Sequence, residues 1–123
     1  MKSIRVHQTG GPEVLQLQEM PDLKPAPGQI LIKIHAVGVN PVETYIRSGS
    51  YARKVNLPYT PGTDAAGVVE AVDSAVTSVK VGDRIYTSGT ITGAYAEYAL
   101  CSEFHVHRLP ASVSFAQGAS VGL

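Results

Sequence analysis

The sequence has almost no cysteine, no excess of charge and no long apolar run. Cys101 is the single cysteine among 123 residues, which excludes an internal disulfide and fits a reducing compartment. Ten basic and ten acidic side chains cancel, so binding to nucleic acid through bulk electrostatics is excluded, whereas a local basic patch is not. No segment approaches the roughly 18 apolar residues of a membrane span, and the first residues lack the apolar core of a signal peptide. We therefore expect a cytoplasmic protein.

Recognisable cofactor loops are also missing. No Gly-x-Gly-x-x-Gly motif occurs. Gly62 and Gly67 have the spacing of a phosphate loop, but Val68 and Val69 follow where the loop needs lysine and serine or threonine. The sequence thus predicts no dinucleotide-binding loop in this chain.

Metal ligands are few. His105 and His107 are two residues apart on an expected strand and would project from one face, as two ligands can. A zinc site needs at least a third protein ligand, and only His7, His35, Cys101 and scattered carboxylates are available. We expect no metal and interpret the pair as polar residues on a half-exposed strand.

The residues that are present favour a mainly β domain. Valine, isoleucine and threonine make up about a quarter of the chain, and 12 glycines and 8 prolines are spread along it. The clearest strand is 29–38, where Ile30, Ile32 and Ile34 alternate with more polar residues. Further strands are expected near 4–8, 14–20, 64–72, 85–88, 95–101 and 104–109, and a helix from Ser114 onward. A small, partly open barrel that spans residues 1–123 as one domain is the predicted fold.

One short helix is expected between Pro41 and about Ser48. Asn40 is a suitable N-cap, Glu43 stands at the third helical position as in a capping box, and Gly49 ends the helix. Tyrosines and cations gather on this helix and in the loop after it: Tyr45, Arg47, Tyr51, Arg53, Lys54 and Tyr59. Glu43 and Arg47, four residues apart, can pair on one helix face. Spacing alone leaves two interpretations open, namely a functional site or a surface loop whose tyrosines pack on the barrel.

Several long motifs occur in register along the chain. They are GGPEVL at 10–15, HAVGVNPVETYIRSG at 35–49, LPYTPGTDAAGVVE at 57–70, KVGDR at 80–84 and GAYAEY at 93–98. Together they resemble the N-terminal half of the medium-chain dehydrogenases/reductases, in particular the quinone oxidoreductase branch that includes the zeta-crystallins. The resemblance implies a GroES-like barrel that is normally followed by a Rossmann domain binding NADPH. It also implies that this chain is a fragment and inactive alone.

The resemblance assigns roles to four residues. Tyr45 is expected against the nicotinamide end of NADPH, with Asn40 in the same pocket, and both would act as catalytic and cofactor-binding residues. Tyr51 and Arg47 are weaker candidates for lining the quinone cleft. Asn40 and Thr63 stand where zinc alcohol dehydrogenases of the wider family hold cysteine and histidine, which implies a zinc-independent enzyme.

The resemblance also leaves other roles open. Zeta-crystallins can serve as structural lens proteins or bind RNA, and Arg47, Arg53 and Lys54 could form a small basic patch for RNA. The full-length family is expected to form homo-oligomers, namely tetramers, with the association surface on the segment that this chain lacks. Asp73, where the quinone branch usually has glycine, is expected to alter a turn without altering the chemistry.

Overall fold

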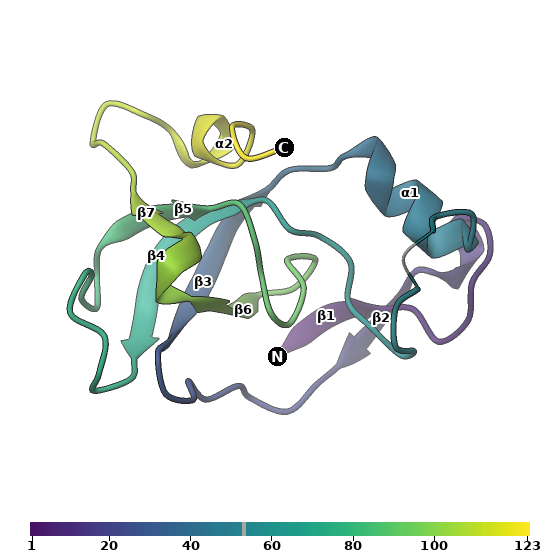
Figure 1. Ribbon diagram of the computed structural model, residues 1–123, viewed down its shortest axis with the longest axis horizontal. Coiled ribbons are helices and arrows are strands. Elements are labelled where there is room, and N and C mark those ends of the chain that lie inside the picture. The colour runs from purple at the N-terminus through teal and green to yellow at the C-terminus, as the bar shows by residue number, and fades with distance from the viewer. Residues whose placement is uncertain (53) are drawn as a thin grey trace.

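Strands with a few short helices between them follow one another along the chain (Figure 1). The computed structural model describes residues 1–52 and 54–123. The strands are β1 (Lys2–Arg5), β2 (Gln16–Glu19), β3 (Gln29–Val37), β4 (Ala65–Val72), β5 (Arg84–Thr87), β6 (Tyr98–Ser102) and β7 (Val106–Arg108). The helices are α1 (Pro41–Ser48) and α2 (Phe115–Gly118), with 3-10 turns η1 (Pro12–Val14) and η2 (Glu103–His105).

The strands form two antiparallel sheets that do not close into one barrel. The larger sheet has the order β6-β3-β4-β5-β7, and β1 and β2 form the smaller one. Isolated bridges between Ser3 and Ala96 and between Val6 and Tyr59 connect the smaller sheet to loops of the larger one. Figure 1 shows α2 over one face of the larger sheet and α1 beside the smaller sheet. The predicted mainly β, partly open barrel is confirmed.

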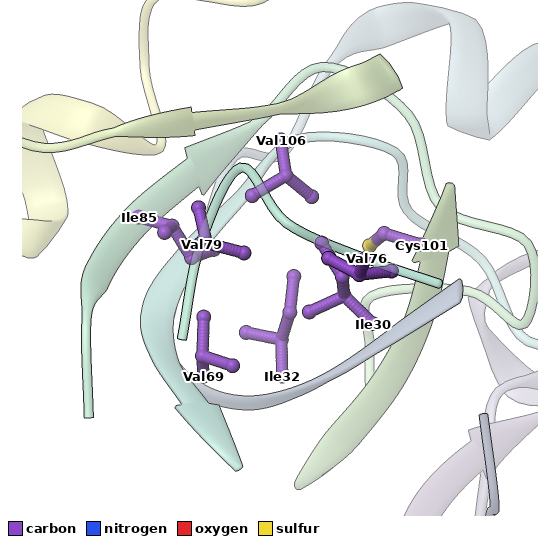
Figure 2. Packing of buried hydrophobic residues seen from close by; sticks show 8 residues of the cluster. All are labelled: Ile30, Ile32, Val69, Val76, Val79, Ile85, Cys101 and Val106. Atoms are coloured by element: carbon purple, nitrogen blue, oxygen red, sulfur yellow. The ribbon is translucent and has the colours of Figure 1, made fainter. Parts of the chain in front are cut away.

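The core lies inside the curve of the larger sheet. Ile30 and Ile32 on β3 are fully buried, as the alternation of this strand predicts. They pack with apolar side chains of β4, β5, β6, β7 and the loop after β4, which Figure 2 shows converging on one centre: Val69, Val76, Val79, Ile85, Cys101 and Val106. On the other face of β4, Ala66 packs against Leu109 and Ala119. The first half of β4 is therefore buried on both faces.

Three local expectations differ from the structure. Val14 belongs to η1, because Pro12 opens a 3-10 turn, and the expected strand begins only at Gln16. His105 lies in η2, whose start Ser102 caps, so it does not share a strand face with His107. The helix after Ser114 ends at Gly118 after a single turn.

Candidate functional site

α1 begins and ends where the sequence predicts. Asn40 is its N-cap with extended backbone, and the Asn40 N–H donates to Glu43 Oε2 at 2.6 Å. Gly49 ends the helix, and its N–H donates to the Ile46 carbonyl at 3.1 Å. Local capping chemistry therefore fixes the limits of the element that carries Asn40, Tyr45 and Arg47.

The Asn40 side chain is held by a buried carboxylate. Its Nδ2 donates to Asp64 Oδ2 at 3.0 Å, and Asp64 is only 2% exposed. The Asp64 backbone carbonyl accepts the Gly38 N–H at 2.8 Å, which ties the segment before α1 to the segment before β4. One N–H of the Asn40 amide is thus engaged, and the side chain has a defined orientation at the start of the helix.

Tyr45 projects from α1 toward solvent. Its side chain is 51% exposed, and no described residue forms a hydrogen bond with its hydroxyl. Its backbone carbonyl accepts the N–H groups of Ser50 and Tyr51 at 3.1 and 3.3 Å, which closes the C-terminal turn. The phenol is therefore free to contact another group, while its backbone is fixed.

Arg47 and Lys54 make local contacts. Arg47 Nε donates to the Gly10 carbonyl at 3.2 Å, and the Gly10 N–H donates back to the Arg47 carbonyl at 3.0 Å. Lys54 Nζ donates to the Gly49 carbonyl at 3.2 Å. Arg53, the third member of the suggested basic patch, lies outside the described residues. The predicted Glu43–Arg47 pair is not formed, because the Glu43 carboxylate turns inward.

A large cleft opens between the smaller sheet, α1 and the loops that precede β4 and follow β5. Its volume is about 920 Å³. Tyr51 is the only one of the four predicted site residues that lines it; Asn40, Tyr45 and Arg47 lie outside its walls. Apolar and hydroxyl-bearing side chains alternate along these walls, among them Val42, Ile46, Tyr59, Thr60, Thr63 and Ile91.

Glu43 and two tyrosines form a buried polar group in one wall of this cleft. Tyr95 OH donates to Glu43 Oε2 at 2.8 Å. Burial, and then the Glu43 carboxylate, raise the pKa of Tyr95, and burial raises the pKa of Tyr59. Among the described residues, Glu43 Oε1, the Tyr59 hydroxyl and Ser3 Oγ are buried without a hydrogen-bond partner, and all three residues line the cleft.

Sequence reasoning missed this group as part of a site. Glu43 was identified only as a cap and as a possible partner of Arg47, and Tyr59 only as one of several tyrosines. The Glu43–Tyr95 contact joins residues 52 positions apart, so no local spacing could reveal it. No group of three histidine, cysteine, aspartate or glutamate side chains suited to a metal ion occurs in the part of the chain that the structure describes. None of its helices is long and apolar enough to cross a membrane.

The fold and the motifs define the class of domain to which this chain belongs. The chain belongs to the family of alcohol dehydrogenase GroES-like domains, whose model matches residues 26–111.

Relatives within that class are quinone oxidoreductases. The chain is 55% identical over its full length to the human quinone oxidoreductase, of which it spans 38%. The structure of Escherichia coli quinone oxidoreductase complexed with NADPH has 40% identity and a TM-score of 0.93 over 98% of this chain and 37% of that one. A mycobacterial protein complexed with NADPH has 39% identity and a TM-score of 0.90, over 97% of this chain and 37% of that one. The predicted similarity to quinone oxidoreductases is confirmed along the whole chain.

Proposed function

We propose that this chain is the substrate-side part of a zinc-independent, NADPH-dependent quinone oxidoreductase. The observation that carries the proposal is the 55% identity to the human quinone oxidoreductase along the whole chain. Because the chain spans 38% of that relative, the activity proposed here is that of this domain together with a nucleotide-binding domain. The single, buried cysteine fits a cytoplasmic location.

The start of α1 fits one end of the cofactor. Tyr45 presents an exposed hydroxyl without a partner among the described residues, and Asp64 orients the amide of Asn40 at the helix N-cap. Both groups can bind the nicotinamide end through hydrogen bonds, whereas the pyrophosphate needs a glycine-rich loop at a helix N-terminus. When bound, NADPH supplies the hydride, and the residues of this chain orient its reactive end.

Donors on this chain would stabilise charge on the quinone. As an oxygen of the quinone gains electron density, a fixed hydroxyl donor lowers the energy of the transition state. Tyr45 is the first candidate for that donor, and Tyr51, which lines the cleft, is a candidate contact to the quinone ring. Arg47 remains a weaker candidate, since its Nε already donates to the Gly10 carbonyl. Asn40 and Thr63 replace the strong zinc donors of the wider family, so we propose chemistry without zinc.

Quinone-dependent oxidation of NADPH tests this function. The chain should be joined to the remaining segment of a quinone oxidoreductase and assayed with a simple quinone, beside the 123-residue chain alone. We expect turnover only in the joined protein, with less than one zinc per chain by elemental analysis. Calorimetry should detect no binding of NADPH to the chain alone, since Tyr45 and Asn40 contact only one end of the cofactor.

A matched pair of variants tests the role of Tyr45. Tyr45→Phe removes the donor and keeps the ring, and we expect about a tenfold loss of kcat in the joined protein. Tyr98→Phe, a half-buried tyrosine on β6, serves as the control and should leave kcat unchanged. Equal kcat values in the two variants would remove Tyr45 from the proposed machinery. No turnover in the joined protein would refute the function itself.

A further inference from the structure

α1 packs against the rest of the domain without a buried apolar face. It has eight residues, and Glu43 is the one residue of the helix that is buried; Val42 and Ile46 are only half-buried. Helices this short are marginal in isolation and normally depend on a buried apolar face. The placement of α1 therefore depends to an unusual degree on one carboxylate.

The Glu43 carboxylate is more deeply buried than a cap requires. A glutamate at the third helical position caps equally well from the surface, where water satisfies its second oxygen. Here the side chain is 7% exposed, and none of the described residues forms an ion pair with it. Burying a carboxylate without an ion pair is unfavourable, and only hydrogen bonds and the positive end of the helix dipole offset that cost. Helix capping alone does not account for this arrangement.

Tyr95 links Glu43 to two other walls of the cleft. Its hydroxyl donates to Glu43 Oε2 at 2.8 Å. Its backbone carbonyl accepts the Ile4 N–H of β1 at 2.8 Å, and its own N–H donates to the Pro61 carbonyl at 2.9 Å. The Tyr95–Glu43 bond therefore ties α1 to β1 and to the loop that precedes β4.

We propose that Glu43, held by Tyr95, is a positioning residue that fixes α1 and thereby orients Asn40 and Tyr45 toward the ligand. This role rests on the proposed function, because it assigns the two residues on α1 to cofactor contact. Glu43 Oε2 also accepts the Asn40 N–H at 2.6 Å, so the oxygen that binds the Tyr95 hydroxyl also binds the N-cap residue of the helix. We call the Tyr95–Glu43 hydrogen bond the clamp. Loss of the Tyr95 hydroxyl should consequently weaken the placement of both Glu43 and Asn40.

The first experiment needs only the 123-residue chain. Amide hydrogen exchange by NMR is compared in the wild-type chain, Tyr95→Phe and the control Tyr98→Phe, each of which removes one tyrosine hydroxyl. We expect the amides of α1 to exchange about tenfold faster in Tyr95→Phe, as loss of one hydrogen bond to a charged group implies, and no more than twofold faster in the control. Equal exchange rates of the α1 amides in the two variants would show that the Tyr95–Glu43 bond does not hold the helix in place.

The second experiment tests positioning in the joined two-domain protein. Tyr95→Phe should lower kcat/KM for NADPH several-fold, and this loss should be smaller when Tyr45→Phe is already present, because part of it then acts through a contact that is already gone. Glu43→Gln, which keeps an acceptor oxygen, should retain more kcat/KM than Glu43→Ala. A loss of the same size with and without Tyr45→Phe would show a merely structural role and overturn the proposal.

The two proposals can fail separately. Faster exchange in α1 together with an inactive joined protein would refute the proposed function, and the positioning role with it, while the clamp would stand. An active joined protein whose α1 exchange is unchanged in Tyr95→Phe would leave the function intact and refute the inference about Glu43.

Discussion

Gly93 lies where two walls of the cleft meet, and a methyl group there should separate them. Its φ is +93°, and a Cβ at this position would overlap the carbonyl oxygen of Thr60 and lie 2.6 Å from its carbonyl carbon. Gly82 has nearly the same φ, +92°, but a Cβ there meets nothing within 4 Å. Gly82→Ala thus measures the backbone cost alone, and Gly93→Ala measures the same cost plus the steric overlap.

The expected losses of stability follow from the backbone cost and the steric overlap. The left-handed conformation costs a non-glycine residue about 1–2 kcal/mol. Overpacking adds about 1–3 kcal/mol, because the backbone opposite Gly93 is held by hydrogen bonds from Ala94 and Tyr95 to Gly62 and Pro61 and cannot move freely. We expect a free energy of unfolding lower by about 1.5 kcal/mol in Gly82→Ala and about 3.5 kcal/mol in Gly93→Ala. At roughly 2.1 cal/mol/K of unfolding entropy per residue, these losses correspond to Tm decreases of about 6 and about 14 °C.

Thermal melts of the wild-type chain, Gly82→Ala and Gly93→Ala, followed by circular dichroism, measure the difference in stability directly. Urea titrations of the same chains check that the two substitutions change the midpoint without changing the slope. Equal Tm decreases in the two variants would refute the close approach of Gly93 to Thr60, and with it the described shape of the cleft.

Three further predictions concern pH, packing and the thiol. A hydrogen bond from the backbone N–H of Gly28 is the main cause that lowers the pKa of Asp73 below its ordinary 3.8. The Asp73 carboxylate therefore stabilises the fold above pH 3.8, and this stabilisation is lost as the pH falls through the folded-state pKa. Urea midpoints should consequently fall less steeply below pH 4 in Asp73→Asn than in the wild-type chain. Ile32→Ala, at a fully buried position, should lower the free energy of unfolding by about 3 kcal/mol, and Leu17→Ala, on the exposed face of β2, by less than about 0.5 kcal/mol, as urea titrations will measure. Burial raises the pKa of Cys101 to about 12, so a thiol reagent at pH 7.5 should label the chain in urea but not when folded.

Elements with strong local signals could be predicted from the sequence. The alternation of Ile30, Ile32 and Ile34 places β3 correctly, because a strand with one buried face needs that period. Asn40 and Gly49 bound α1, because capping depends on residues within one turn. The 3-10 turns could not be predicted in this way, since the apolar pattern around Val14 also suits a strand.

The contacts that build the site are nonlocal. Asn40 meets Asp64 across 24 residues, and Glu43 meets Tyr95 across 52. Spacing along one element does not report such pairs; the order of strands in the sheets brings them together. Resemblance to a family assigned roles to residues on α1, whereas the structure was needed to identify the buried carboxylates that contact this helix.

A crystal structure of the joined two-domain protein with NADPH tests the central claim most directly. The nicotinamide end should lie against the start of α1, within hydrogen-bond distance of the Tyr45 hydroxyl or the Asn40 amide. A bound cofactor whose contacts all come from the nucleotide-binding domain, with α1 left facing solvent, would contradict the account.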